Sequence, residues 1–232
     1  MVMLKIRDDV DLKELEKFGR WLEYHCWWLL IRRKWIERRY KMKEKVKINT
    51  DNRIIIMSAD VTEESISIVS DAILNMIAED NTNKLVIHNY NVRPIKLFIN
   101  SYGGDIYDCM QLIDIIENST TPIKTFCLGK AMSAGFLIFL AGHYRYMSKN
   151  ATLMYHQVSQ GTYGTCAQIL EDVEELTYMQ DKIEKYVLEK TKISKKKLEE
   201  VRKCKRDWYI HSEEALKLGV ADTILDNQRR DF

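Results

Sequence analysis

Ser133 lies in a run of small residues, Gly129 to Gly135, between an apolar strand-like segment and an apolar helix-like segment. Small neighbours let a substrate backbone approach a hydroxyl closely. A helix that begins at the serine also directs free N–H groups and the positive end of its dipole toward it. These features suit an exposed nucleophile. A serine before a helix is also a common N-cap, so the local pattern leaves both interpretations open.

Three further positions could complete the chemistry of nucleophilic acyl transfer, which needs a base, an acid and an oxyanion hole. His156 ends an apolar strand-like segment, and Asp207 follows a charged run. Gly103 and Gly104 follow another strand-like segment and offer backbone N–H groups that no side chain covers. Taken singly, each has a structural alternative: a strand-end histidine, a capping or ion-paired aspartate, and a tight turn.

Other chemistries lack their motifs in this sequence. Ala131 occupies the first glycine position of the G-x-S-x-G elbow found in α/β-hydrolases. No G-x-G-x-x-G, Walker loop, H-E-x-x-H or other metal-ligand spacing occurs. The five cysteines are odd in number and form no C-x-x-C pair, which predicts reduced thiols rather than zinc or disulfides. We therefore expect no cofactor and no metal.

Composition limits the partners. The chain has 232 residues, of which 46% are hydrophobic and 30% charged, enough for a sizeable core. The net charge of +2 argues against nucleic acid as the main partner. No apolar run, Cys26 to Ile31 included, is long enough to span a bilayer, and the first residues lack the apolar region of a signal peptide. We expect a cytoplasmic protein without a membrane span.

Strand-like and helix-like segments alternate from residue 53 onward, which predicts an α/β fold with largely parallel strands. The predicted strands are 54–57, 85–88, 95–99, 123–128, 145–147, 152–155 and 220–225. The predicted helices are 61–77, 105–116, 133–141, 165–191, 194–203 and 212–218. In an open parallel sheet the active crevice lies at the carboxyl ends of the strands, where Gly104, Ser133 and His156 fall.

Residues 1–50 differ from the rest. They carry fourteen Lys and Arg against eight Asp and Glu, together with most of the tryptophans, at spacings that suit amphipathic helices. A polar break at 49–52 predicts a boundary between this basic, aromatic extension (1–50) and a catalytic domain (51–232). The extension could be a solvated docking helix, a partner-binding arm, or a contact to a membrane surface or nucleic acid.

Five motifs, read together and in order, resemble the proteolytic subunit of the Clp protease, the caseinolytic protease of serine peptidase family S14. They are Arg53-Ile-Ile-Ile-Met57, Phe98-Ile-Asn-Ser-Tyr-Gly-Gly104, Ala131-Met-Ser-Ala-Gly135, Met154-Tyr-His-Gln157 and Arg206-Asp-Trp-Tyr209. The resemblance covers about residues 53–225. Five motifs at compatible intervals are far more specific than any one alone.

The resemblance implies a role for each matching residue. Ser133 would be the nucleophile, His156 the general base and Asp207 the acid that orients the histidine. The backbone N–H groups of Gly104 and Ala134 would form the oxyanion hole. The enzyme would be a serine endopeptidase that cuts unfolded polypeptides through an acyl-enzyme.

The resemblance also implies an assembly. The fold would be the Clp protease/crotonase-like spiral of repeated ββα units with a long protruding handle helix, here about 157–195. Handles would join two stacked seven-membered rings, with Arg206 at the contact between rings. An AAA+ unfoldase would supply unfolded chains at the expense of ATP, while the peptidase itself binds no cofactor. The location would be cytoplasmic, in the host cytosol if the chain is phage-encoded, or in an organelle.

Three departures from the family pattern keep alternatives open. Tyr102 replaces a proline, and Val158 stands close to where another proline follows the His-Gln pair. Residues 1–50 do not match the family's pore loop and first helix. A phage-type head-maturation protease of the same fold could use that segment as an assembly arm. A crotonase-type acyl-CoA hydratase or isomerase shares the architecture but needs a carboxylate at the reacting centre. An inactive scaffold paralogue would be expected to lack a triad position, and all three are present.

Overall fold

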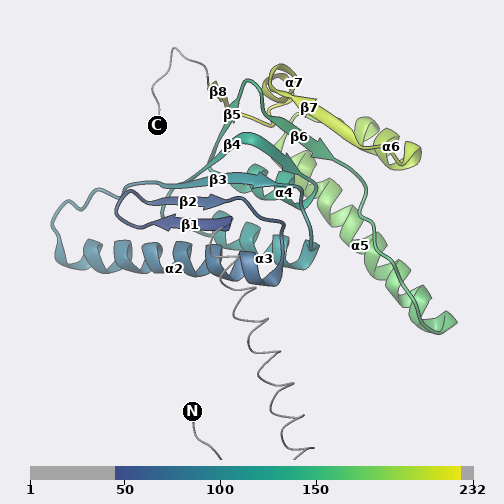
Figure 1. Ribbon diagram of the computed structural model, residues 1–232, viewed down its shortest axis with the longest axis horizontal. Helices are drawn as coiled ribbons and strands as arrows, with labels where there is room; N and C mark the ends of the chain where they lie inside the picture. The colour runs from purple at the N-terminus through teal and green to yellow at the C-terminus, as the bar shows by residue number, and fades with distance from the viewer. Residues whose placement is uncertain (1–44, 226–232) are drawn as a thin grey trace, which may run out of the picture. The chain divides into compact units, whose positions relative to one another are not determined.

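A mostly parallel sheet of eight strands organises residues 45–225, which are the residues that the computed structural model describes (Figure 1). Six strands follow the order β1-β2-β3-β4-β5-β8; β6 pairs with β4, and β7 with β6. The strands are β1 Val46–Asn49, β2 Ile54–Met57, β3 Ile95–Ser101, β4 Ile123–Met132, β5 Tyr144–Ser148, β6 Thr152–Tyr155, β7 Trp208–His211 and β8 Thr223–Leu225. The predicted mixed α/β fold is confirmed. The helices predicted for residues 1–44 lie outside the described residues.

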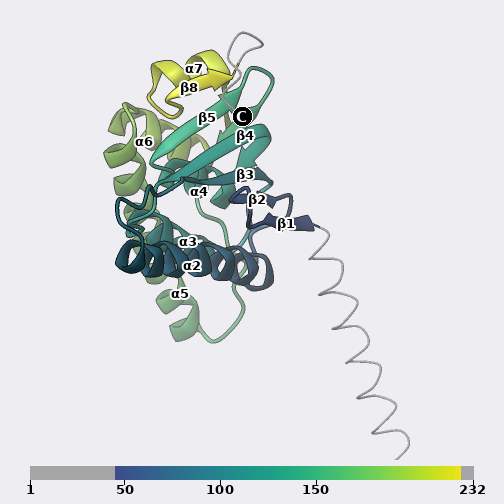
Figure 2. The ribbon, with the colours of Figure 1, turned by 90° about the vertical axis from the view of Figure 1, so that its left-hand side faces the viewer.

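Helices α2, α3 and α4 lie together on one face of the sheet, and one end of α5 extends away from it (Figures 1 and 2). The helices are α2 Glu63–Val86, α3 Ile106–Glu117, α4 Ala134–Ala141, α5 Cys166–Lys190, α6 Lys195–Cys204 and α7 Ser212–Lys217. In α5 the buried residues begin at Met179, so the half nearer Cys166 has no core to pack against within residues 45–225. That half corresponds to the protruding part of the predicted handle.

The core is centred on α4, whose eight residues are all buried. A helix that is apolar on every side is stable only when other elements surround it. Here α3, α5 and strands β3, β4 and β6 contact it. Because α4 is enclosed in this way, its first residue, and Ser133 before it, are held in a fixed position.

Strand β4 has different partners at its two ends. On one side β3 pairs in parallel with both parts of β4. On the other side Lys124–Cys127 pair with β5, whereas Lys130–Met132 pair with β6. The β3–β4 register shifts between Ile99 and Ser101, where the strand changes neighbours. Bulges of this kind bend a strand and redirect the side chains that follow it, often next to active sites. The bend brings the end of β4 beside the end of β6.

The predicted strand at 85–88 is wrong, because α2 continues to Val86 and is followed by turns and a loop. The polar residues in the last turns of α2 belong to the helix surface or to a buried ion pair. Asp80 is fully buried on α2 and accepts hydrogen bonds from the Arg53 guanidinium. A charged residue inside the core breaks the pattern that would have shown the helix in the sequence.

The polar break at 49–52 is a tight turn rather than the end of a domain. It joins β1 to β2, which pair antiparallel, and the Asn52 N–H donates to Asn49 Oδ1. The unit that contains the sheet begins at Lys45, five residues before the predicted boundary at 50. Strands β1 and β7 were not predicted, because each has only four residues and a mixed polar pattern.

Candidate active site

Ser133 occupies the N-cap position of α4, but its side chain does not cap the helix. The hydroxyl instead lies 2.7 Å from Nε2 of His156. The backbone has φ 53° and ψ −123°, a region that non-glycine residues seldom adopt and that costs about 1–3 kcal/mol. The Ser133 N–H donates to the Met154 carbonyl at 2.9 Å, which ties the turn to β6. The open choice between cap and nucleophile is therefore decided against the cap.

The antiparallel register of β6 and β7 places His156 beside Asp207. Tyr155 of β6 is paired with Trp208 of β7. His156 follows Tyr155 and Asp207 precedes Trp208, so the antiparallel pairing makes His156 and Asp207 neighbours. Nδ1 of His156 lies 3.3 Å from Oδ1 of Asp207. The histidine side chain is 30% exposed and that of the aspartate 49%. The three predicted triad residues are thus in contact, in the order Ser133, His156, Asp207.

Gly103 and Gly104 have positive φ angles, 104° and 147°, and both face close neighbours. A Cβ on Gly103 would lie 2.6 Å from Cβ of Ser133, and one on Gly104 would lie 2.1 Å from the Val61 carbonyl oxygen. Any other residue at either position would move the loop away from the serine. Val61 fixes the loop by donating its N–H to the Gly103 carbonyl and accepting from the Asp105 N–H.

Gly104 and Ala134 both line the cavity beside Ser133, and each carries a backbone N–H. Within residues 45–225 neither of them donates to another backbone or side-chain group. Ala134 is the first residue of α4, where the helix dipole favours negative charge. Two free donors beside a nucleophile can stabilise an oxyanion.

A cavity of about 540 Å³ opens beside Ser133 and His156. Its apolar wall comes from Ile106, Leu137, Tyr155, Val158 and Ile183. Its polar wall comes from Asp105, Tyr107, Ser159 and Gln160. An elongated ligand with an apolar side chain next to the reacting bond would fit these walls.

Apart from Gly104, Ser133, Ala134 and His156, the sequence did not identify the residues that line this cavity. The segment after His156 contributes Val158 to Gln160, which form no strand and show no periodic pattern. Ile183 on α5 did carry a signal, because it lies four residues after Met179 and four before Val187 on one buried stripe. That stripe indicated a packed helix face but not that a cavity begins there.

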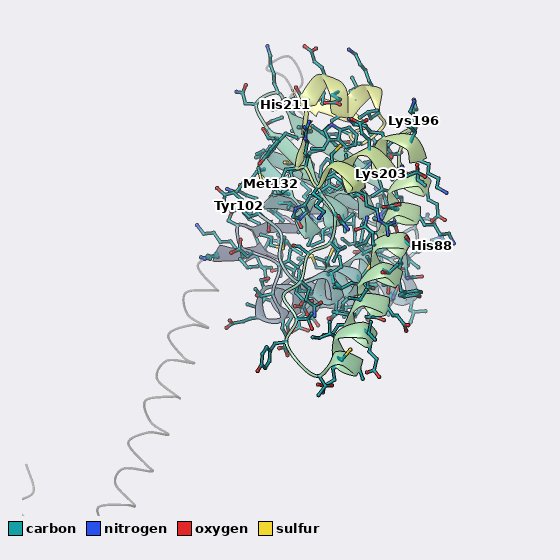
Figure 3. The ribbon with its side chains drawn as sticks, turned by 90° about the vertical axis from the view of Figure 1, so that its right-hand side faces the viewer. His88, Tyr102, Met132, Lys196, Lys203 and His211 are labelled. Atoms are coloured by element: carbon teal, nitrogen blue, oxygen red, sulfur yellow. The ribbon has the colours of Figure 1, made fainter. Side chains whose placement is uncertain are left out.

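Arg206, the predicted contact between rings, is exposed next to Asp207. It makes no ion pair within residues 45–225, so its role stays a prediction. Figure 3 shows Tyr102, which stands where a proline was expected, beside Met132 at the end of β4. The Lys130 ammonium lies 4.0 Å from the centre of the Tyr102 ring.

Cysteine residues do not compete with Ser133 as nucleophiles in this region. Cys109 and Cys127 are fully buried, and burial raises the pKa of both thiols, that of Cys127 to about 12. Their thiolates are therefore scarce at neutral pH. Among residues 45–225 no group of three His, Cys, Asp or Glu side chains is arranged to hold a metal ion, and no helix could cross a bilayer.

A family model and three relatives that this chain resembles are all described as Clp proteases. Residues 46–228 match the family model described as Clp protease. The "ATP-dependent Clp protease proteolytic subunit 2" of Chlamydia trachomatis is 28% identical over 180 residues, 77% of this chain and 83% of the relative. The "ATP-dependent Clp protease proteolytic subunit" of Deinococcus radiodurans is 30% identical over 139 residues, 59% and 67%. "Subunit 1" of Prochlorococcus marinus is 28% identical over 179 residues, 76% and 85%.

Proposed function

The chain belongs to the Clp protease family and is a serine-type endopeptidase, and we propose that Ser133, His156 and Asp207 are its catalytic triad. The observation that carries this proposal is the 2.7 Å contact between the Ser133 hydroxyl and His156 Nε2. A hydroxyl is a weak nucleophile unless a neighbouring base can take its proton. Nε2 is at the distance at which a base does so.

In the proposed mechanism Ser133 Oγ attacks the carbonyl carbon of a peptide bond and its proton passes to His156 Nε2. Asp207, 3.3 Å from Nδ1, orients the ring and stabilises the imidazolium. The histidine then gives the proton to the departing amine, which leaves an acyl-enzyme on Ser133. Water, deprotonated by the same nitrogen, hydrolyses the acyl-enzyme and restores the hydroxyl.

The Gly104 and Ala134 N–H groups are the proposed oxyanion hole. In the tetrahedral intermediate the former carbonyl oxygen carries a negative charge, and these free donors border the space that it would occupy. Removal of one such donor from a serine protease costs about 10²–10³ in kcat. Every group in this mechanism comes from the chain itself, so the proposed reaction needs no metal and no cofactor in the peptidase.

The proposed substrates are unfolded polypeptides. This is supported by the cavity beside the serine, whose apolar wall includes Leu137 and Ile183 and offers a surface to an apolar side chain of a substrate. Such side chains are exposed in unfolded proteins and mostly buried in folded ones. We propose further that the chain acts in the cytoplasm as a stacked, seven-membered double ring served by an AAA+ unfoldase. Family membership and the protruding half of α5 support this assembly.

The test compares the wild type with Ser133→Ala on a short fluorogenic peptide and with a fluorophosphonate probe. We expect the wild type to cleave the peptide and to be labelled at Ser133, as located by mass spectrometry. Ser133→Ala should lose at least about 10³ in kcat and all labelling. Ser148→Ala, at the end of β5 and outside the cavity, is the matched control. Full activity of Ser133→Ala would overturn the proposal.

A further inference from the structure

Gln180 on α5 is a buried polar side chain that the triad chemistry does not use. It is 3% exposed and lies on the part of the helix that packs against the core. A buried side-chain amide is costly unless both its oxygen and its nitrogen find partners. The partners of Gln180 lie on both sides of His156.

The amide oxygen of Gln180 accepts the backbone N–H of Val158 at 2.9 Å. Its amide nitrogen lies 3.3 Å from the hydroxyl of Tyr155, to which it can donate. Tyr155 immediately precedes His156, and Val158 follows it by two residues. A single side chain from α5 therefore holds the backbone before and after the proposed base.

Glu184, one turn further along α5, determines which way the Gln180 amide faces. Its Oε1 accepts the Gln180 nitrogen at 2.7 Å. A carboxylate can only accept, so the amide nitrogen must point toward it and the oxygen toward Val158. Glu184 is itself 8% exposed and needs a compensating charge.

That charge comes from Arg202 on α6, whose NH1 lies 3.6 Å from Glu184 Oε1 and 3.1 Å from Asp181 Oδ1. Helix α6 ends at Cys204, and its C-cap Lys205 is left-handed with φ 49°. Asp207 follows two residues after that cap. The same chain of contacts therefore continues from the backbone around His156 to the helix that precedes Asp207.

We propose that Gln180, oriented by Glu184, is a positioning residue that holds His156 in line with Ser133 and Asp207. It touches neither the serine nor the space for substrate, and acts through the backbone at Tyr155 and Val158. Because Val158 also lines the cavity, Gln180 holds one wall of the substrate site as well. The catalytic part of the inference rests on the proposed triad, whereas the bracing of Val158 does not.

The experiment uses the full chain and measures kcat, KM, the rate of fluorophosphonate labelling, and amide exchange at Val158 by mass spectrometry. Gln180→Met keeps the length of the side chain and removes its three hydrogen bonds, to Val158, Tyr155 and Glu184. We expect it to lower kcat and the labelling rate about 10- to 100-fold, because small displacements of reacting groups have effects of that size. The Val158 amide should exchange faster. Lys182→Gln, exposed on the same helix, should leave all four measurements unchanged.

A swap of the two side chains separates positioning from simple packing. Gln180→Glu alone places a second carboxylate against Glu184 and should be at least as impaired as Gln180→Met. The double variant Gln180→Glu/Glu184→Gln restores an acceptor for Val158 and a donor between the two residues. We expect it to recover kcat to within about threefold of the wild type, on the scale of effects expected from residual misplacement. Recovery would not occur if position 180 merely filled space.

Two results would overturn the inference: wild-type kcat and slow Val158 exchange in Gln180→Met, or a folded double variant that shows no recovery. If Gln180→Met does not fold, Tyr155→Phe removes only the contact between Gln180 and the Tyr155 hydroxyl. The double variant then tests the contact between position 180 and the Val158 N–H. A wild type that no fluorophosphonate labels would overturn the proposed function instead. The bracing of Val158 would then still be decided by its amide exchange.

Discussion

Two pairs of oppositely charged or chargeable side chains in this chain differ in burial and in the number of their contacts. Arg53 and Asp80 form a bidentate pair at 3.0 and 2.6 Å, with side chains that are 4% and 0% exposed. His156 and Asp207 make one contact at 3.3 Å, with side chains that are 30% and 49% exposed. The first pair joins the start of β2 to the middle of α2, and the second lies at the edge of the active-site cavity.

The buried pair is built so that its charges do not change. Asp80 accepts from Arg53, from the Thr121 hydroxyl at 2.6 Å and from the Tyr90 hydroxyl at 2.8 Å, so both its oxygens are fully used. Burial by itself raises the pKa of this carboxyl. The hydrogen bonds from Thr121, Tyr90 and Arg53 and the positive charge of Arg53 outweigh that effect and hold the pKa below its ordinary value of 3.8.

The pair of His156 and Asp207 is open to solvent, and in the proposed mechanism His156 gains and loses a proton. Its position comes from the backbone register of β6 and β7 rather than from a closed set of hydrogen bonds. Solvent reaches both side chains, so a charge on this pair does not incur the desolvation penalty of a buried charge. Under the proposed function Asp80 serves stability and Asp207 serves chemistry, and the same substitution at both tests this.

Asp207→Asn should have the largest effect, and only on activity. The amide cannot hold the imidazole in the tautomer that accepts the serine proton, so we expect kcat to fall by about 10³–10⁴. The free energy of unfolding should change by less than about 0.5 kcal/mol, because the side chain is half exposed. Peptidase kinetics and urea denaturation measure the two quantities.

The matched control for that substitution is Asp114→Asn, an exposed residue on α3 that should alter neither measurement. If Asp207→Asn kept kcat within tenfold of the wild type, Asp207 would not be the orienting acid.

Asp80→Asn should show the reverse behaviour. It leaves the Arg53 guanidinium buried without its counter-charge, which typically costs about 3–5 kcal/mol of unfolding free energy. The kcat of the molecules that remain folded should be unchanged, because α2 does not line the cavity. Urea denaturation gives the first quantity, and active-site titration with the fluorophosphonate, combined with rate measurements, gives the second.

Asp71→Asn, exposed on the same helix, controls for any effect on α2 itself. Unchanged stability in Asp80→Asn would mean that the buried pair contributes nothing beyond what a neutral network provides.

The pH dependence of stability should come from the buried pair. Because the pKa of Asp80 is lower in the folded chain than in the unfolded chain, the unfolded chain binds more protons between the two values. The stabilisation is complete above about pH 4 and is lost as the pH falls through the folded pKa. Urea midpoints between pH 7 and pH 3 should therefore drop more in the wild type than in Asp80→Asn. Equal slopes in the two proteins would contradict this assignment.

The smallest effect should come from the exposed contact between Lys130 and Tyr102, which lies beside the site but belongs to neither pair. An exposed cation–π contact contributes about 0.5–1 kcal/mol. Lys130→Met should therefore lower the unfolding free energy by no more than that and change kcat less than threefold. Lys124→Met, over the Tyr146 ring at 5.6 Å, is the comparison. A large loss of activity in Lys130→Met would contradict this and would mean that the contact with Tyr102 helps to position the proposed oxyanion-hole loop at Gly103 and Gly104.

The ends of helices could be predicted from residues close to them in the sequence. The long helix was expected to run from Thr165 to Thr191, and those residues are the N-cap and C-cap of α5. Helix ends are recognisable because caps satisfy backbone groups within a few residues of the end. The prediction of a strand at 85–88 was wrong because α2 continues through Asp80, a charged residue in the core. Asp80 is stable there only because the distant Arg53 pairs with it, which no local pattern shows.

The sequence by itself determined the chemical groups, their order along the chain and the alternation of strands and helices, because hydrophobic period and capping are local properties. Only the tertiary structure decided that the Ser133 hydroxyl faces His156 rather than capping α4, and that β7 brings Asp207 to the histidine. It also decided that Gln180 joins α5 to the backbone around that histidine. These are contacts between segments far apart in the chain, and they depend on strand register and helix packing, which no local pattern encodes.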